Sequence, residues 1–163
     1  MKITIRTALP EDLDRIMEIY AHARNFMARN GNPSQWGNTY PDRRQIEQDI
    51  TASHCQVCIT ESGSIAGVFS LIAGPDPTYN RIEDGGWPDE RPYKVIHRLA
   101  SDGRCSGIAG ACIRWCSGQT DCLRADTHRD NRIMQHILEK NGFIKCGTIH
   151  VDDGSARTAY QKN

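Results

Sequence analysis

A glycine-bearing loop in the second half of the chain, Asp102 to Ala109, combines the residue types that bind phosphate. It follows the apolar run from Tyr93 to Ser101, which predicts a strand, and it leads into apolar residues at helical spacing. A helix entrance offers unpaired backbone N–H groups and a positive dipole end, which together bind phosphate. Gly107 permits the close approach of a pyrophosphate, Ser106 can add a hydroxyl donor, and Arg104 adds positive charge. Because no lysine ends the loop, the sequence excludes a P-loop for nucleoside triphosphates.

Three further residues near this loop have side chains that can move a proton. His97 lies on the predicted strand that leads into the loop, and an imidazole pKa near about 6.5 suits proton transfer at neutral pH. Asp126 and His128 end the next predicted strand, either as partners of His97 or as its substitutes. Structural interpretations stay open for all three: a hydrogen-bonded core histidine, a turn aspartate and a solvated histidine.

The elements that must position these residues can be placed from hydrophobic periodicity and turn chemistry. The chain predicts strands at 2–7, 56–61, 64–73, 93–101, 122–126, 143–151 and 156–161, and helices that begin at Pro10, Pro41, Ile108 and about Asn131. The long loop 74–91 between two strands is expected to be functional or mobile. The order β-α-α-β-β-β-α-β-α-β-β predicts an α/β fold, a mixed sheet with helices on its faces, in one domain spanning residues 1–163.

Composition narrows the class of protein and its partners. Twenty acidic and twenty basic side chains balance, which gives no electrostatic argument for nucleic acid or a membrane surface as a partner. No apolar run reaches the roughly 20 residues that span a bilayer, and the N-terminus lacks the pattern of a signal peptide. We therefore expect a cytoplasmic protein.

Seven cysteines without a secretory signal argue for reduced thiols rather than disulfides. The pairs Cys55/Cys58 and Cys112/Cys116 would hold zinc only if they converged in space. Cys112 and Cys116 lie on the apolar side of their predicted helix, where a free cysteine behaves as a small hydrophobe. We therefore expect no metal site.

The loop 104–109, Arg-Cys-Ser-Gly-Ile-Ala, resembles the R/Q-x-x-G-x-G/A signature of the GNAT acetyltransferase superfamily. The strand residues 96–100 and the later Asn131…Asn141-Gly142-Phe143 stand where that family has its other motifs. The opening Ile-Arg-Thr-Ala…Asp-Leu of residues 5–13 also resembles a common GNAT start. The resemblance covers essentially the whole chain.

The resemblance implies a mixed, mostly antiparallel sheet of about six or seven strands with about four helices, splayed to form a cleft for acyl-CoA. Acetyl-CoA would be the co-substrate, with the backbone of Leu99 and Ala100 pairing with its pantetheine arm. The resemblance places the pyrophosphate on the amides of Arg104, Cys105, Ser106, Gly107, Ile108 and Ala109. Asn131 would contact the cofactor, although Asn131 as a helix N-cap and Gly107 as a helix-start glycine remain alternatives.

The implied activity is N-acetyl transfer to a primary amine of a small-molecule or amino-acid-like acceptor, directly within a ternary complex. A backbone N–H of Leu99 or Ala100 would hold the oxyanion. Many GNAT enzymes use a tyrosine to protonate the leaving thiolate, and at the corresponding position this chain has Leu138. No motif places another tyrosine, such as Tyr160, beside the sulfur of the cofactor.

By the same resemblance, the acceptor pocket would take Gln35, Trp36 and Tyr40 from the loop between the first two helices and Arg157 from the last hairpin. Arg157 could bind a carboxylate bidentately, or be a solvated charge on an edge strand. A homodimer is possible because dimers are common in such enzymes.

Two other functions compete with an acetyltransferase. The pattern from Gly103 to Ala109 also resembles the glycine motif of short-chain dehydrogenases, but it lies too far along a short chain with hairpins on both sides. An acyl-CoA-binding regulatory module without catalysis is the second alternative, and Leu138 is its best support.

Overall fold

A computed structural model describes residues 2–163 and contains a seven-stranded sheet in the order β1-β2-β3-β4-β5-β7-β6. The strands are β1 (Thr4–Thr7), β2 (Cys55–Ile59), β3 (Ile65–Ala73), β4 (Lys94–Ser101), β5 (Leu123–Thr127), β6 (Ile144–His150) and β7 (Ala156–Lys162). The helices are α1 (Leu13–Arg29), α2 (Arg43–Thr51), α3 (Ile108–Ser117) and α4 (Arg132–Lys140). The predicted fold class and element order are confirmed.

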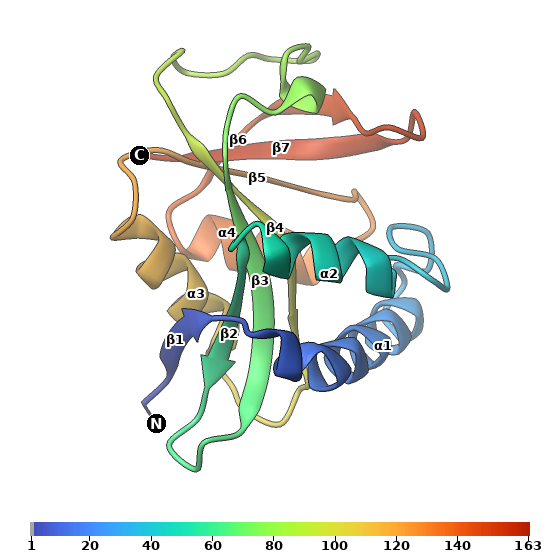
Figure 1. The fold of residues 1–163 in the computed structure, drawn as a ribbon. Helices are drawn as coiled ribbons and strands as arrows, with labels where there is room; N and C mark the ends of the chain where they lie inside the picture. Colours follow the sequence, from blue (N-terminus) through green and yellow to red (C-terminus); the bar gives the residue numbers. More distant parts are fainter. Residues whose placement is uncertain (1) are drawn as a thin grey trace.

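Helices cover both faces of the sheet, with α1 and α2 on one face and α3 and α4 on the other (Figure 1). On the first face, Ile16, Tyr20 and Ile46 pack against β2 and β3 with none of their surface exposed. On the second face, Ile113 and Leu138 pack against β4 and β5. Each helix therefore buries one apolar face, as its periodicity predicts.

Capping residues set where the helices begin. The 3₁₀ turn Pro10–Asp12 precedes α1, and the Asp12 carboxylate accepts the Leu9 N–H at 2.7 Å. For α2, the Asp42 carboxylate accepts the Gln45 N–H at 2.8 Å, so the helix begins just after the predicted Pro41.

The sheet opens between β4 and β5, its one parallel pair of strands. Only Lys94 and Val95 pair with β5, opposite Leu123 and Arg124, and beyond them the strands separate. Figure 1 shows β5, β6 and β7 running across the direction of β2 and β3. Because the carboxyl halves of β4 and β5 have no strand between them, their backbone and side chains line a cleft.

A β-bulge interrupts the part of β4 that has separated from β5. Val68 of β3 pairs with Ala100, whereas Ser70 pairs with His97, so one residue of β3 faces two of β4. Arg98 takes the left-handed backbone conformation there, with φ +54°, and its carbonyl accepts the Tyr20 hydroxyl at 2.8 Å. The bulge turns β4 away from β5 and re-aims the side chains beside it.

The last hairpin closes the sheet with β7 inside and β6 at the edge. β7 pairs antiparallel with both β5 and β6. The alternative of Arg157 as a solvated charge on an edge strand is therefore wrong, because β7 is an inner strand and Arg157 is 7% exposed.

The loop between β3 and β4 packs on the end of the sheet through a third apolar cluster that includes Tyr79 and Ile149. The Arg124 guanidinium stacks on the rings of Trp87 and Tyr93, 3.9 and 4.1 Å from their centroids. This loop is thus an ordered part of the fold, which argues against the mobile alternative.

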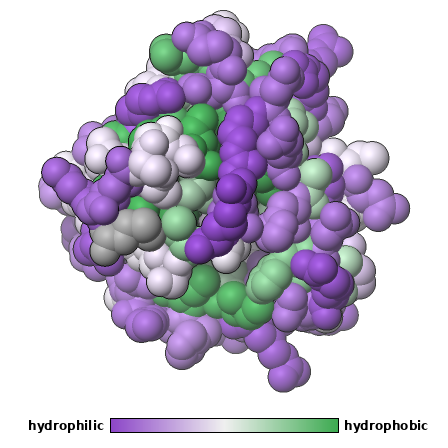
Figure 2. All heavy atoms as spheres, turned by 90° about the horizontal axis from the view of Figure 1, so that it is seen from below, coloured by the Kyte–Doolittle hydropathy of each residue, from purple (hydrophilic) through white to green (hydrophobic). Residues whose placement is uncertain are grey.

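Cys112 and Cys116 are fully buried in the apolar cluster between α3 and the sheet, as predicted. Cys55 belongs to the cluster on the other face, so it does not converge with them. Within residues 2–163, no helix has both the length and the apolar character needed to cross a bilayer. The face seen from below is mostly hydrophilic, with hydrophobic residues visible in separate areas (Figure 2).

Candidate active site

A cleft of about 940 Å³ lies where β4 and β5 separate. Its lining comes from both sides of the opening and from the loop between α1 and α2, and it includes His97, Leu99, Ala100, Asp126, Asn131 and Arg157. Most of the residues that the sequence singled out thus meet in one place. The volume lies within the range of small-molecule and cofactor sites.

The loop predicted to bind phosphate borders this cleft, because Gly103, Ile108 and Ala109 belong to the cleft lining. Gly107 has φ +79° and caps α3, so the loop curls back before the helix begins. Within residues 2–163, the amides of Cys105, Ser106 and Gly107 donate to no other group. Unpaired amides beside a helix N-terminus form an anion site, so the loop fits a pyrophosphate.

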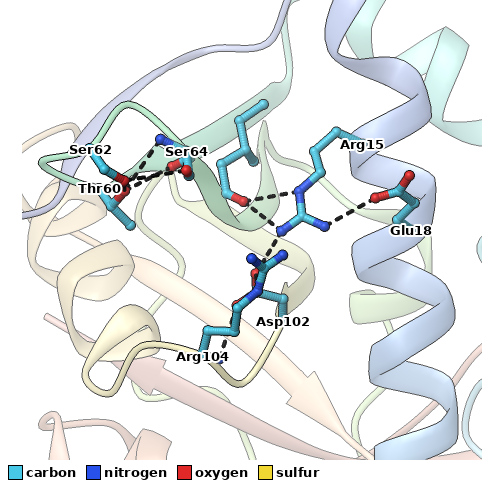
Figure 3. A network of polar contacts seen from close by, with 8 residues as sticks. Arg15, Glu18, Thr60, Ser62, Ser64, Asp102 and Arg104 are labelled. Carbon is cyan, nitrogen blue, oxygen red and sulfur yellow. Dashed lines mark hydrogen bonds and ion pairs between the residues drawn. The ribbon is translucent and has the colours of Figure 1, made fainter.

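An ion-pair network holds the start of this loop against α1 (Figure 3). The Asp102 carboxylate accepts Arg15 Nη2 at 2.6 Å and the Arg104 backbone N–H at 3.0 Å. Arg15 also donates to the Ile65 carbonyl at 2.9 Å and pairs with Glu18 at 3.2 Å. The loop is therefore fastened to both α1 and the start of β3.

The side chain of Arg104 also belongs to this network, since its Nε lies 2.9 Å from Asp102 Oδ2. Its predicted charge near the phosphate site is partly neutralised by that carboxylate. The side chain is 69% exposed and can still turn toward an anion. The unpaired amides, rather than Arg104, are therefore the stronger feature of the loop.

Asn131 lines the cleft and is also the N-cap residue of α4. Its Oδ1 accepts the Met134 N–H at 3.0 Å, which realises the N-cap alternative. The same bond makes Nδ2 the end that faces Gln35 Oε1, at 3.1 Å. Gln35 Oε1 also accepts Asn32 Nδ2 at 2.9 Å and Thr127 Oγ1 at 3.4 Å.

These bonds tie the loop between α1 and α2 to the opposite wall of the cleft. Gln35 comes from that loop, whereas Thr127 and Asn131 come from the end of β5 and the start of α4. Gln35 Nε2 makes no hydrogen bond within residues 2–163. Gln35 thus links the two walls of the cleft, like a strap, through its side-chain oxygen. Only its side-chain nitrogen is left to donate a hydrogen bond to an acceptor substrate.

Trp36 and Tyr40 form the aromatic wall of the same loop. The rings of Trp36 and Tyr20 meet edge to face at 5.7 Å, and those of Trp36 and Tyr40 at 6.3 Å. The Tyr40 hydroxyl accepts Arg98 Nη1 at 3.1 Å. Both predicted residues line the cleft, and Tyr40 remains 40% exposed at its mouth.

Beneath this wall lies a buried ion pair that the sequence did not reveal. Arg98 Nη2 lies 2.8 Å from Asp49 Oδ2, and Ser70 Oγ donates to the same carboxylate at 2.9 Å. Asp49 is 3% exposed on α2, so its charge is compensated by these partners. The pair joins α2 to the bulge of β4 and fixes the floor of the cleft.

His97 meets a carboxylate other than the two expected. Its Nε2 lies 3.2 Å from Oδ2 of Asp76, in the loop after β3. Burial raises the pKa of Asp76, but the hydrogen bonds from His97 and Thr78 outweigh it and lower that pKa to about 2. Because an ionised carboxylate only accepts, Nε2 carries the proton and Nδ1 is left as the basic nitrogen.

Asp126 lies in the same cleft and is in a different electrostatic state. Burial raises its pKa, although the Tyr79 hydroxyl donates to Oδ2 at 2.7 Å and His97 and Arg157 supply positive potential. Asp126 is therefore a carboxyl group that can hold or lose a proton closer to neutral pH than an exposed aspartate.

The structure does not bring His128 to the cleft with these residues. Its Nδ1 accepts the Asp130 N–H at 3.0 Å and so stabilises the turn after β5. Burial lowers its pKa, and Arg157 and Arg129 lower it further. Since Nδ1 is engaged and the ring is absent from the cleft lining, His128 has a structural role in this turn.

Leu138 is 2% exposed on α4, belongs to the cleft lining and packs in the apolar cluster. The neighbouring positions that line the cleft, Met134 and Ile137, are apolar too. Tyr160 lies within the same cluster, and its hydroxyl faces Glu139 at 3.4 Å. This wall of α4 therefore carries no tyrosine acid.

Sequence reasoning missed Asp76 and Tyr79, which supply the partners of His97 and Asp126. Both come from the long loop 74–91, whose length was the one signal that it is functional. Asp49 gave no signal beyond being a polar residue about one turn after Ile46 and next to Ile50 on an amphipathic helix. Such long-range pairings are set by the bulge and the loop path, which one sequence does not display.

The chain is similar to solved structures over nearly its whole length. It is 34% identical to a GNAT-family acetyltransferase from Streptococcus agalactiae 2603, covering 98% of this chain and 94% of that one, with a TM-score of 0.83. The chain belongs to the GNAT family of acetyltransferases. No protein-family model and no curated protein matches its sequence.

Two other GNAT structures share the fold at lower identity. One, from Listeria monocytogenes 4b F2365, is 21% identical with a TM-score of 0.73, covering 98% of this chain and 94% of that one. The other, a phosphinothricin acetyltransferase from Sinorhizobium meliloti in complex with AcCoA, is 17% identical with a TM-score of 0.68, covering 99% and 88%. The splayed sheet is thus a GNAT sheet, and the predicted superfamily is confirmed.

Proposed function

We propose that this GNAT protein is an N-acetyltransferase that uses acetyl-CoA and acts on a primary amine of a small molecule. The observation that carries the proposal is a cleft with unpaired loop amides at one end and the His97–Asp76 pair in its wall. The first feature suits a pyrophosphate, and the second suits removal of a proton from an amine. Acetyl-CoA in a GNAT relative of the same fold supports the choice of cofactor.

The residues predicted for the cofactor keep that role in the proposal. The amides of residues 104–109 hold the pyrophosphate, and Asn131 lies beside its path at the start of α4. Leu99 and Ala100, next to the bulge of β4, present backbone to the pantetheine arm and an N–H to the developing oxyanion.

His97 acts as the general base through Nδ1, and Asp76 positions its ring and keeps the proton on Nε2. The amine nitrogen attacks the thioester carbonyl, the N–C bond forms, and the C–S bond breaks to give an amide and a thiol. The acceptor ammonium loses two protons in all. One leaves through His97 to solvent, and the other ends on the sulfur of coenzyme A.

Asp126 takes part by facing the acceptor amine. A carboxyl group between His97 and Arg157 can accept a hydrogen bond from an ammonium group and hold it in the cleft. It belongs to the candidate catalytic group with His97, whereas His128 does not.

The test is thiol release from acetyl-CoA with a panel of primary amines. His97→Gln is expected to lower kcat about 100-fold or more, while KM for acetyl-CoA stays within about twofold. His136→Gln is the control, because His136 is an exposed histidine of α4 outside the cleft. Equal kcat in the two variants would remove His97 from the mechanism.

A non-catalytic acyl-CoA-binding module is the second candidate, favoured by the apolar wall at Leu138. Saturable binding of acetyl-CoA without thiol release on any amine of the panel would support it. Thiol release that requires an amine and forms an N-acetyl product would exclude it.

A further inference from the structure

Arg124 and Arg157 are buried within residues 2–163, and the side chain of Arg98 is 10% exposed. The surroundings of these three arginines differ. Arg98 is paired with the carboxylate of Asp49. Arg124 stacks between Trp87 and Tyr93 and donates to Gln161 Oε1 at 2.9 Å. Arg157 has neither a carboxylate within 4.0 Å among the described residues nor an aromatic ring against it.

The hydrogen bonds of Arg157 go only to neutral oxygens. Nη1 donates to Ser155 Oγ at 2.7 Å and to the Ala156 carbonyl at 3.1 Å, and Nη2 donates to the Gln35 carbonyl at 3.2 Å. A guanidinium has about five N–H groups, so the Nε–H and one on Nη2 are left over. Nε is not among the buried atoms without a partner, so it stays accessible.

The position of this guanidinium points to a ligand. Arg157 lines the cleft, on the inner strand β7, and its carbonyl partner Gln35 is the strap across the acceptor side. Burying an uncompensated cation is unfavourable, and most buried charges are paired. A buried guanidinium without a carboxylate partner, at the wall of a cleft, is therefore suited to bind an anionic group of a ligand.

The amine-handling groups lie next to it. Arg157, Asp126 and His97 all line the cleft, and both Arg157 and His97 act electrostatically on Asp126. An acceptor with its anion on Arg157 would thus direct a nearby amine to Asp126 and His97.

We propose that the acceptor carries a carboxylate next to its primary amine, as an amino acid does, and that Arg157 binds this carboxylate. The inference rests on the proposed N-acetyltransferase activity. Two free N–H groups on a planar guanidinium match the two oxygens of a carboxylate. Arg98 cannot do the same, because Asp49 already occupies it.

The test compares three acceptors with one carbon skeleton: an amino acid, its carboxamide and its decarboxylated amine. For the wild-type protein, kcat/KM is expected to be highest for the amino acid, by about 10-fold or more. Arg157→Gln should raise KM for the amino acid about 10- to 100-fold and leave KM for acetyl-CoA and for the carboxamide nearly unchanged.

Two variants keep the test decisive. Arg129→Gln removes a positive charge from the turn after β5, outside the cleft. This variant should change neither the KM for the amino acid nor the KM for acetyl-CoA. Arg157→Lys keeps the charge without the planar fork and should fall between wild type and Arg157→Gln. If Arg157→Gln does not fold, the lysine variant and the three-acceptor comparison still decide.

The outcomes separate this inference from the proposed function. Equal or better turnover of the decarboxylated amine by wild type would overturn the carboxylate subsite and leave the acetyltransferase intact. Acetyl-CoA binding with no turnover of any acceptor would overturn the proposed function itself. An equal rise in KM for all three acceptors in Arg157→Gln would reduce Arg157 to a structural residue.

Discussion

At the scale of single residues, two aspartates of the cleft differ in what their charge does to stability. The hydrogen bonds from His97 and Thr78 lower the pKa of Asp76 to about 2 despite its burial. Burial raises the pKa of Asp126. The folded state therefore favours the charged form of Asp76 and the neutral form of Asp126.

This contrast predicts opposite effects of two matched substitutions. The Asp76 carboxylate stabilises the folded state at pH values above its unfolded pKa of about 4, and this stabilisation is lost as the pH falls toward about 2. Asp76→Asn should therefore lower the unfolding free energy at pH 7 by on the order of 1 kcal/mol, after allowance for solvent screening. The contribution of Asp126 is lost as the pH rises through its raised folded pKa, so Asp126→Asn stabilises at pH 7.

Thermal midpoints of both variants and wild type between about pH 3 and pH 8 check this prediction. At about pH 3, the thermal midpoints of Asp126→Asn and wild type should become equal, because Asp126 is then neutral in both the folded and the unfolded state. Destabilisation by Asp126→Asn at pH 7 would mean that its carboxylate is the stabilised form, and the assignment of its charge state would then be wrong.

At the scale of elements, the turn into α3 owes its shape to Gly107. With φ +79°, a side chain there costs about 1–2 kcal/mol, and no atom lies within 4 Å of an added Cβ. That open space is the place where we expect the pyrophosphate. Gly107→Ala should therefore lower stability by about 1 kcal/mol and also raise KM for acetyl-CoA several-fold.

Gly63 provides the matched control. It has φ +86° and equally open space, but it lies in the hairpin turn between β2 and β3, away from the cleft. Gly63→Ala should show the same loss of stability with KM for acetyl-CoA unchanged. The same rise in KM for both variants would point to a general loosening of the fold.

The link from α1 to the phosphate loop gives a second prediction at this scale. Arg15→Ala leaves the carboxylate of Asp102, which is 9% exposed, without its shortest ion pair, and should cost about 2–4 kcal/mol in unfolding free energy. Arg43→Ala is the control, because its pairs with Asp14 and Glu47 are exposed and should cost at most about 1 kcal/mol.

Urea unfolding of the two variants measures this difference. Arg15→Ala should also weaken acetyl-CoA binding, since the loop loses its attachment to α1. Equal losses in the two variants would show that Asp102 finds enough compensation in Arg104 alone.

At the scale of the whole molecule, the cleft divides a sheet whose two halves share only a short parallel pairing at β4 and β5. A cofactor lying in that opening would contact both halves and stabilise the folded state. At about 100 times its dissociation constant, acetyl-CoA should add roughly 2.7 kcal/mol, which raises the thermal midpoint by several degrees.

Thermal unfolding with acetyl-CoA, CoA and NAD over a concentration series is the measurement. We expect shifts with both CoA species and none with NAD. A shift with NAD alone would favour the dinucleotide alternative and contradict the proposed cofactor. The expected homodimer stays a prediction, for which sedimentation of the protein is the direct measurement.

The sequence by itself determined the order of the elements and the family, because these depend on local periodicity and on a contiguous motif. The phosphate-binding role of the loop 104–109 stays a prediction. The sequence also showed that Leu138 stands at the position where many GNAT enzymes have a tyrosine, and in the structure Leu138 is buried in an apolar wall.

Only the tertiary structure decided which side chains meet. The bulge at Arg98, the path of the loop that carries Asp76, and the insertion of β7 between β5 and β6 bring together residues that are distant in sequence. His97 therefore pairs with Asp76 rather than with Asp126 or His128, and Arg157 is buried rather than solvated. Local patterns specify elements, but strand order and backbone irregularities set the distances on which the chemistry depends.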